Sequence, residues 1–257
     1  MMSIAIVTGA SSGIGLEFFK SLINKEENLD EIWVIARSRE KLLELQKLTN
    51  IPLKVLAYDL SNDNSFYDIE AILKAEKPNI KYLFCGSGFG RFESIENDDL
   101  KVLTNMVDLN CKGVLGMTKI CMPYMMKDSQ MIVIASVAGM QPIPYIATYA
   151  ASKAFVLSYG RALNKELKKY RSRCLTVCPF WTKTAFFDRA NSENQVVKKY
   201  AVMYEPKDIV KRIWKDLKHK KRDVSVCGAY TKGQSLLVKL LPHRMVMWVW
   251  MRQQKLK

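Results

Sequence analysis

Hydrophobic residues along the chain gather in short runs that are separated by helix-length segments. Seven runs have the length of buried strands, namely residues 4–9, 31–37, 52–60, 80–86, 130–136, 173–179 and 223–228. Most of these runs are apolar at successive positions, which is typical of parallel strands that helices cover on both faces. The alternation of strands and helices predicts an α/β fold with a doubly wound parallel sheet.

The intervening segments predict helices, among them residues 15–25, 38–48, 103–126 and 147–170. A Rossmann-type sheet of this kind binds ligands beyond the carboxyl ends of its strands, so residues with chemical roles should gather there. No linker or repeat interrupts the pattern. We therefore expect one catalytic domain over residues 1–230 and a tail, residues 231–257, that packs on it or extends it. Residues 185–204 lack a strand signal and should form an insertion over the sheet's rim.

Composition and charge narrow the possible functions. The chain is 49% hydrophobic and 25% charged, which is typical of a folded globular protein. Its 40 Lys and Arg residues outnumber 25 Asp and Glu residues, so the surface should attract phosphorylated cofactors, acidic carrier proteins, nucleic acid or anionic lipid. Six cysteines without a CxxC pair and only two histidines do not match zinc-site spacing. We expect no metal cofactor, and reduced thiols in a cytoplasmic protein.

The C-terminal tail combines apolar and basic residues. No apolar run reaches the roughly 20 residues that a membrane-spanning helix requires. Residues 245–251, MVMWVWM, have basic flanks, and Asp223 is the last acidic residue of the chain. The tail could therefore lie on an anionic membrane as a peripheral contact, or it could cap the substrate pocket or a neighbouring subunit. The sequence leaves these alternatives open.

A glycine-rich segment, TGASSGIG at residues 8–15, directly follows the first predicted strand and opens a helix. Glycines permit a tight turn and allow backbone N–H groups to approach a pyrophosphate at the positive end of the helix dipole. The alternative is a turn that only links strand to helix. The residues predicted to contact a dinucleotide here are Gly9, Ser11, Ser12, Gly13, Ile14 and Gly15.

The residues after the second and third strands bear on cofactor preference. A chain that uses NAD commonly carries an acidic residue after the second strand, whereas this sequence reads ARSRE at residues 36–40. Arg37, with Ser38, Arg39 and Ser11 or Ser12 nearby, is predicted to pair with the 2′-phosphate of NADP(H), since guanidinium matches phosphate geometry. The alternative is a solvated residue at a helix start. Asp59, next to Leu60, could accept a hydrogen bond from adenine or could cap the following helix with Ser61.

The segment TYAASK, residues 148–153, places a tyrosine and a lysine on the same side of a helix. A cation near Tyr149 would lower its pKa from about 10, so Lys153 could make it a proton carrier near neutral pH. The alternative is an ordinary buried phenol. Ser136 ends an apolar strand where a substrate oxygen could bind. The two histidines, His219 and His243, lie in basic or tail contexts, so a hydrolase triad is not expected.

Five sequence features together resemble the short-chain dehydrogenase/reductase family over residues 4–227. They are TGASSGIG, DLN at 108–110, Ser136, YAASK and CPFWTKT at 178–184. The resemblance implies that Tyr149 protonates a carbonyl oxygen that Ser136 orients, while hydride arrives from the nicotinamide. It also implies that Lys153 binds the nicotinamide ribose and lowers the tyrosine pKa, and that Asn110 holds a water in the proton relay. Tyr149, Lys153 and Asn110 would then be cofactor contacts as well. A homo-oligomer, dimer or tetramer, through the helices of Asn110 and Tyr149 is implied too.

The sequence departs from the family pattern in two places. Cys85, Gly86, Ser87 and Gly88 replace the usual NNAG, so the amides that brace the sheet are missing while Gly86 can still contact the cofactor through its backbone. Pro179 is followed by Phe180 instead of glycine, and phenylalanine does not readily adopt a positive φ. Pro179, Thr182 and Thr184 nevertheless match the segment that contacts the nicotinamide and pyrophosphate in the family.

Substrate selectivity in this family resides in the loop after the sixth strand and in the C-terminus. Those regions contain Trp181, Phe186, Phe187, Met203 and Tyr204 besides the tail. An aromatic, methionine-rich lining favours a steroid, bile acid or lipid ketone, although these side chains could instead pack a core or a subunit contact.

The sequence thus predicts an NADP(H)-dependent oxidoreductase that interconverts a secondary alcohol and a ketone on a hydrophobic substrate. No nucleic-acid partner is expected. The alternatives are reduction of a 3-oxoacyl group on an acidic carrier protein, and a non-catalytic NADP-binding sensor or scaffold.

Overall fold

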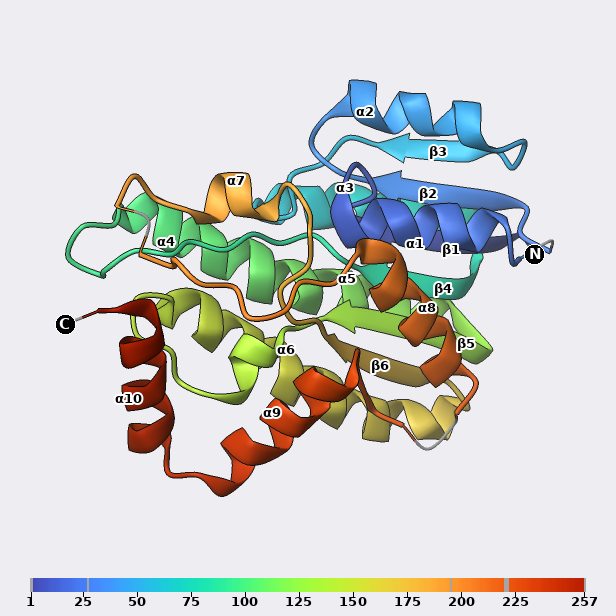
Figure 1. Ribbon diagram of the computed structural model, residues 1–257. Helices are drawn as coiled ribbons and strands as arrows, with labels where there is room; N and C mark the ends of the chain where they lie inside the picture. Colours follow the sequence, from blue (N-terminus) through green and yellow to red (C-terminus); the bar gives the residue numbers. More distant parts are fainter. Residues whose placement is uncertain (1, 27, 195, 220–221, 257) are drawn as a thin grey trace.

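Seven parallel strands form one sheet in the order β3-β2-β1-β4-β5-β6-β7 in the computed structural model, which describes residues 2–26, 28–194, 196–219 and 222–256 (Figure 1). The strands are β1 (Ser3–Thr8), β2 (Glu31–Ile35), β3 (Leu53–Leu56), β4 (Asn79–Cys85), β5 (Met125–Ile134), β6 (Arg173–Cys178) and β7 (Val224–Val226). The predicted α/β fold and its parallel sheet are therefore confirmed.

Helices cover both faces of the sheet. The helices are α1 (Gly13–Ile23), α2 (Arg39–Leu43), α3 (Asp63–Glu76), α4 (Leu100–Val107), α5 (Gly113–Cys121), α6 (Ala147–Glu166), α7 (Phe186–Ala190), α8 (Pro206–Leu217), α9 (Ala229–Leu240) and α10 (His243–Gln254). Side chains of α3, α5 and α6 share one buried cluster with the sheet, and side chains of α1, α2 and α8 share another. This double cover explains why the strands are apolar at successive positions.

The helix predicted over residues 103–126 is wrong at its C-terminal end. Helix α5 ends at Cys121, a 3-10 turn follows over Met122–Tyr124, and β5 already begins at Met125. Pro123 lies at the start of that turn, where its ring and missing N–H do not allow an α-helix to continue. Between α4 and α5 the backbone adopts one π-helical turn, Asp108–Lys112, which contains Asn110.

The strand order places the two loops that matter for a ligand next to each other. β1 pairs with β2 on one side and with β4 on the other. Strands β2 and β3 are therefore added on one side of β1, and all strands from β4 onward are added on its other side. The loops that leave the carboxyl ends of β1 and β4 diverge at this point and open a crevice, the usual ligand position in such sheets.

The described residues of the predicted insertion, 185–194 and 196–204, lie over the rim of the sheet and contain the short helix α7 but no named strand (Figure 1). The backbone N–H of Phe92 donates to the carbonyl of Ala190 at 2.8 Å, which ties this insertion to the loop after β4. The absence of a strand in this segment agrees with the sequence prediction.

The tail packs against the same domain. Helix α9 starts at Ala229, two residues before the boundary expected from the sequence, and residue 257 lies outside the described residues. The Trp250 indole donates to the carbonyl of Pro144 at 3.0 Å. The Gln254 amide accepts from the backbone N–H groups of Lys198 and Lys199 and donates to the Lys199 carbonyl. Among the described helices, none has the length and apolar character needed to cross a bilayer.

Candidate active site

A cleft of about 860 Å³ opens at the carboxyl edge of the sheet and continues to the tail helices. Most residues that were predicted to contact the cofactor line this cleft: Gly9, Ser11, Ser12, Gly13, Ile14, Gly15, Arg37, Asp59, Leu60, Gly86, Tyr149, Lys153, Pro179, Thr182 and Thr184. Ser38 and Asn110 are not part of its wall. The sequence therefore located most of the cleft wall, and the predicted cofactor contacts themselves stay predictions.

The loop between β1 and α1 forms a cradle that only glycines can build. Gly9 and Gly13 adopt positive φ values of 71° and 57°, which other residues reach only with strain. A Cβ atom on Gly15 would lie 2.2 Å from the carbonyl oxygen of Gly9, so the helix approaches the loop too closely for any side chain. The first turn of α1 contains no acidic residue, and the Ser12 side chain makes no capping hydrogen bond. Its N–H groups are thus suited to a pyrophosphate.

Thr8 takes over the bracing role that the missing amides of the family motif would play. Its hydroxyl oxygen accepts hydrogen bonds from the backbone N–H groups of Gly86 and Ser87 at 3.1 and 3.2 Å. A Cβ atom on Gly9 would lie 2.9 Å from the Gly86 backbone, so the two loops touch. The sequence analysis missed this role of Thr8, although its position at the end of β1 opposite Cys85 could have indicated it.

Ser38 does not contact the cleft because its side chain caps helix α2. Its hydroxyl oxygen accepts from the Lys41 N–H at 3.4 Å, and its hydroxyl donates to Glu40 at 3.0 Å. Serine is favoured at helix N-caps for this reason. Arg37, one residue earlier, remains exposed at the cleft wall.

Arg37, Arg189 and Asp59 form a charged group at the nucleotide end of the cleft. Partial burial alone would raise the pKa of Asp59, but two hydrogen bonds from Ser61 and the charges of both arginines lower it. Burial lowers the pKa of Arg189, and the charge of Arg37 lowers it further. The cap of the following helix is Asn62, so Asp59 is not that cap.

Arg189 is a cleft residue that the sequence analysis missed. It belongs to helix α7, and its guanidinium carbon lies 3.4 Å from the centroid of the Phe89 ring. Such stacking holds a planar cation without neutralising it. No local motif surrounds Arg189 in the sequence, because only the fold brings the insertion over the end of β2.

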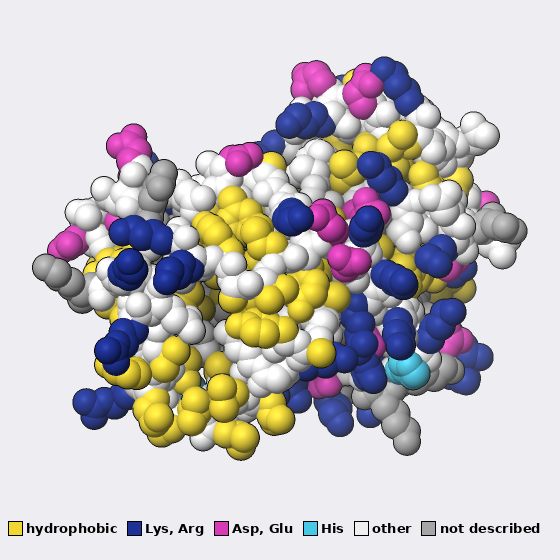
Figure 2. Space-filling view, viewed as in Figure 1, with side chains coloured by type: hydrophobic (Ala, Val, Ile, Leu, Met, Phe, Trp, Pro, Cys, Tyr) yellow, Lys and Arg dark blue, Asp and Glu magenta, His cyan; other side chains and the backbone are white. Residues whose placement is uncertain are grey.

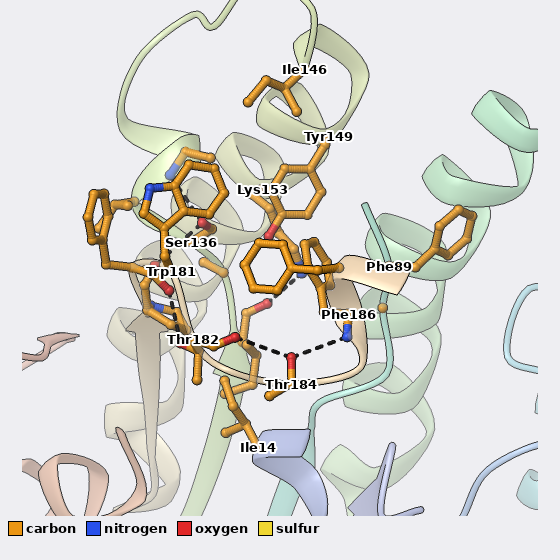
Figure 3. Close-up of a pocket in the computed structure, with 18 of the residues that line it drawn as sticks. Ile14, Phe89, Ser136, Ile146, Tyr149, Lys153, Trp181, Thr182, Thr184 and Phe186 are labelled. Atoms are coloured by element: carbon orange, nitrogen blue, oxygen red, sulfur yellow. Dashed lines mark hydrogen bonds between the residues drawn. The ribbon is translucent and has the colours of Figure 1, made fainter. Parts of the chain in front are cut away.

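Ser136, Tyr149 and Lys153 meet at the centre of the cleft, as Figure 3 shows. Ser136 follows β5 and its hydroxyl accepts from the Ala138 N–H at 3.1 Å. Tyr149 and Lys153 lie one turn apart on α6, and the Lys153 ammonium donates to the Ile134 carbonyl at 2.9 Å. All three side chains are nearly buried. The arrangement puts a hydroxyl, a phenol and an ammonium together in the wall of the cleft.

The prediction that Lys153 lowers the pKa of Tyr149 is wrong in this structure. Burial raises the Tyr149 pKa to about 12, and the hydrogen bond with Ser136 opposes this only in part. Burial also lowers the pKa of Lys153 to about 8. The Lys153 ammonium lies 5.8 Å from the centroid of the tyrosine ring, and it does not offset the desolvation of the phenol. Tyr149 is therefore protonated at neutral pH.

Asn110 is fully buried behind the cleft wall, and its expected role of holding a water in the proton relay stays a prediction. Its amide oxygen accepts from the Phe89 N–H at 3.0 Å, and its amide nitrogen donates to the Phe89 carbonyl and to Ser152. A Cβ atom on Gly88 would lie 2.8 Å from the Asn110 oxygen and 3.4 Å from the Lys153 ammonium. Asn110 thus fixes the loop after β4 from behind Lys153, through the π-helical turn that turns its side chain inward.

Aromatic side chains form the opposite wall of the cleft. The Phe186 ring lies 5.5 Å from the Tyr149 ring, and Trp181 lies 5.9 Å from Phe187 and 5.1 Å from Tyr200 (centroid distances). Phe180 adopts no positive φ, and its ring contacts Trp181 and Tyr230 instead.

Met203 and Tyr204 were predicted to line this wall, and that prediction is wrong. Neither residue reaches the cleft. The Tyr204 hydroxyl is bound by Thr231 at 3.1 Å, because the insertion returns to the sheet at this point. Phe92, which the sequence analysis did not select, packs between Tyr149, Trp181 and Phe186.

Comparison with known proteins identifies the class to which this fold and site belong. The model of the short chain dehydrogenase family matches residues 3–195. The chain therefore belongs to the short-chain dehydrogenase/reductase family, oxidoreductases that bind NAD(P)(H) and act on CH–OH or C=O groups.

Individual relatives and solved structures agree with this assignment. The chain is 31% identical over 208 residues to a very-long-chain 3-oxoacyl-CoA reductase of Anas platyrhynchos, a match that covers 75% of this chain and 66% of that protein. It is 29% identical over 178 residues to an uncharacterized oxidoreductase of Staphylococcus epidermidis, which covers 68% of this chain and 76% of that protein.

Among solved structures, that of a 7beta-hydroxysteroid dehydrogenase has a TM-score of 0.80 at 17% identity, with 96% of each chain covered. A short-chain dehydrogenase from Sphingobium yanoikuyae in complex with NADPH has a TM-score of 0.75 at 20% identity, with 88% of this chain and 87% of that chain covered. A family member from Burkholderia phymatum in complex with NAD has a TM-score of 0.77 at 18% identity, with 92% of each chain covered. These identities show a common fold, and they do not distinguish NADP from NAD for this chain.

Proposed function

We propose that this chain is an NADP(H)-dependent oxidoreductase that interconverts a secondary alcohol and a ketone on a large apolar, lipid-like substrate. One observation carries the proposal: Ser136, Tyr149 and Lys153 form one wall of a cleft whose other wall is aromatic. Burial of apolar substrate surface against such a wall contributes about 25 cal/mol per Å², so a steroid, bile acid or acyl chain is favoured over a small polar ketone.

The chain's own residues account for the proton side of the reaction. NADPH, held by the glycine cradle, would supply a hydride to the carbonyl carbon. Ser136 holds the carbonyl oxygen, and Tyr149 donates its phenolic proton to that oxygen as the alcohol forms. The raised pKa keeps Tyr149 protonated at pH 7, which is the form that reduction requires. Lys153 would bind the nicotinamide ribose, and solvent returns a proton to the Tyr149 phenolate.

Two guanidinium groups support the preference for NADP(H). Arg37 lies close enough to Arg189 at the nucleotide end for its charge to lower the Arg189 pKa, and Asp59 already accepts two hydrogen bonds from Ser61. No acidic residue follows β2 before Glu40, so nothing there would repel a 2′-phosphate. Arginine can bind phosphate in a bidentate manner, which supports a preference for NADP(H).

A 3-oxoacyl thioester is a second candidate substrate. It is favoured by the similarity to very-long-chain 3-oxoacyl-CoA reductases, and the formal charge of +15 would attract an acidic carrier protein or a phosphorylated thioester. The two candidates differ in salt dependence, because screening weakens attraction between charged partners. A kcat/KM that falls steeply with added salt supports the carrier-bound or thioester substrate, and a kcat/KM that does not supports a free apolar ketone.

Replacing Tyr149 by phenylalanine tests the proposed reaction. The Tyr149→Phe variant should lose turnover by roughly a thousandfold, because it removes the general acid. NADPH binding, measured by fluorescence titration, should be retained. Tyr159→Phe is a matched control, since Tyr159 lies on the same helix but its hydroxyl pairs with Thr118 at 2.8 Å. Full turnover by Tyr149→Phe would refute both the proton donor and the reaction, and a scaffold that only binds NADP would show no turnover in any variant.

We further propose that the chain forms a homo-oligomer through α4, α5 and α6. Four large apolar side chains are exposed on these helices: Leu100, Val107, Leu115 and Phe155. Exposed apolar residues that gather on one surface are typical of subunit contacts. Light scattering should give a molar mass of two or four chains, and a monomer would contradict the proposal.

A further inference from the structure

The tail helices expose an unusual concentration of large apolar side chains. Of the seventeen such side chains that are exposed among the described residues, seven lie between residues 230 and 249. Leu240 is 74% exposed and Trp248 is 59% exposed, which leaves most of each side chain in water. The group also contains Tyr230, Leu236, Leu237, Met245 and Val249. We call these residues of α9 and α10 the tail surface; Figure 2 shows apolar side chains gathered over these two helices.

Basic side chains accompany this apolar group. Lys232, Lys239, Arg244, Arg252 and Lys255 are exposed, and the sequence has no acidic residue after Asp223. The Arg252 guanidinium lies 4.9 Å from the Trp248 ring centroid, so one cation stands directly beside the exposed indole. Exposed Trp and Leu side chains with Lys and Arg beside them are typical of helices that lie in a membrane interface.

The tail surface is also continuous with the cleft. Leu237 and Val249 are 54% and 40% exposed, and both line the cleft as well. Buried side chains of the same two helices, Val238, Val246 and Trp250, form the adjoining part of the cleft wall. An apolar molecule could therefore pass from the tail surface into the cleft along apolar side chains.

We infer that the tail surface docks on an anionic lipid membrane. Charge complementarity favours this partner over a second copy of the chain, because a two-fold contact would bring the same basic side chains together on a protein of charge +15. Anionic lipids attract each basic residue near the surface, while the exposed Leu and Trp side chains enter the interface.

Vesicle sedimentation with the full chain tests this inference. Vesicles of phosphatidylcholine with added phosphatidylglycerol should bind the protein more strongly than phosphatidylcholine vesicles, and added salt should weaken the binding. The double variant Leu240→Gln, Trp248→Gln should reduce the vesicle partition coefficient roughly tenfold or more. Neither residue lines the cleft, and both are exposed, so the fold should persist, as circular dichroism can verify. Leu48→Gln, at an apolar residue 48% exposed elsewhere, is the control and should bind as the wild type.

Two double variants that remove the same charge at different places test how much the basic side chains of the tail surface contribute to vesicle binding. Lys239→Gln with Arg244→Gln should weaken binding to anionic vesicles by roughly tenfold or more, since each basic residue contributes about 1 kcal/mol. Lys165→Gln with Lys168→Gln removes the same charge from the exposed end of α6 and η5 (Leu167–Tyr170), and it should change binding little. Equal losses in both pairs would overturn the docking site, because binding would then follow net charge alone.

Three further results would overturn the inference. One is a wild-type protein that does not sediment with anionic vesicles. Another is unchanged vesicle binding by the Leu240→Gln, Trp248→Gln variant together with a lower molar mass in light scattering, which would make the tail surface a subunit contact. The third is binding to a soluble acidic protein without binding to vesicles.

The route from membrane to cleft rests on the proposed function, whereas the docking itself does not. If the substrate enters through the tail surface, the Leu240→Gln, Trp248→Gln variant should raise KM several-fold for a long-chain ketone presented in vesicles. KM for a short, water-soluble ketone should stay unchanged. If no ketone is turned over by any form of the protein, the proposed function fails while vesicle binding still reports on docking. Equal KM changes for both ketones would overturn the route.

Discussion

The two ends of the cleft are built from different material. The nucleotide end consists mainly of backbone and small side chains from consecutive residues, 8–15, fixed by contacts such as that of Gly15 with the Gly9 carbonyl. The substrate end is lined by aromatic rings such as Phe89, Trp181 and Tyr230, which come from segments far apart in the sequence. Backbone cannot rearrange around a new atom, whereas side chains can repack. The nucleotide end should therefore tolerate change poorly and the substrate end well.

The largest effect is expected at the nucleotide end. In Gly15→Ala the added Cβ would meet a carbonyl oxygen at 2.2 Å, and neither backbone segment can move without separating α1 from β1. We expect the free energy of unfolding to fall by about 3 kcal/mol and NADPH binding to weaken strongly. Urea denaturation and fluorescence titration with NADPH measure the two effects.

Gly233 is the matched control for this change. It lies in α9 and has no atom within 4 Å of its ideal Cβ position, so alanine there should raise the free energy of unfolding by about 1 kcal/mol through helix propensity. If Gly15→Ala were as stable as Gly233→Ala and bound NADPH normally, the contrast between a rigid and a tolerant end would be wrong.

Lys153 lies between the two ends, and its replacement should affect activity and stability in opposite directions. Burial lowers its pKa from 10.5 to about 8, so the folded state carries an unfavourable buried ammonium below pH 8. This costs about 3 kcal/mol, and the hydrogen bond to Ile134 returns about 1 kcal/mol. Lys153→Met should therefore be about 2 kcal/mol more stable at pH 7 and nearly inactive.

The stability advantage of Lys153→Met should depend on pH, because the pKa of Lys153 is lower in the folded state than in the unfolded state. Between pH 8 and 10.5 the unfolded chain binds the lysine proton and the folded chain does not, so wild-type stability rises with pH in that window. The advantage of Lys153→Met should be full below pH 8 and disappear by about pH 10.5. Chemical denaturation at several pH values, with exposed Lys165→Met as the control, measures this. An advantage that is constant with pH would show that the buried charge is not its cause.

The same contrast between local and distant residues explains what the sequence could predict. Local patterns indicated the seven strands, the glycine cradle and the Tyr149–Lys153 spacing, because each depends on neighbouring residues. The roles of Arg189 and Phe92 could not be predicted, since only the fold brings the insertion and the loop after β4 together at the cleft. The direction of the Tyr149 pKa was wrong because helical spacing says nothing about burial. Thr8 was missed because its hydrogen-bond partners, Gly86 and Ser87, lie far away in the sequence, in the loop after β4.

Replacing Arg37 at the nucleotide end should have a smaller effect, which is limited to the binding of NADPH. Arg37→Ser removes a charged hydrogen-bond donor that contributes about 1.5–3 kcal/mol, so the Kd for NADPH should rise on the order of tenfold to a hundredfold. The Kd for NADH, which lacks the 2′-phosphate, should change little. Arg39→Ser is the control, since Arg39 does not line the cleft. Equal weakening of NADPH and NADH would contradict the proposed preference, and calorimetric titration with each nucleotide distinguishes the outcomes.

The smallest effect is expected at the substrate end, with Phe187→Leu. The Phe187 ring contacts Trp181, Phe186 and Tyr200, but all these contacts are between side chains, and Phe187 is only partly buried. Leucine can fill much of the space after repacking, so the free energy of unfolding should change by less than about 1.5 kcal/mol. KM for a bulky ketone should change a few-fold, while kcat and the Kd for NADPH stay the same. A loss of stability as large as that of Gly15→Ala would show that the aromatic wall is as rigid as the cradle.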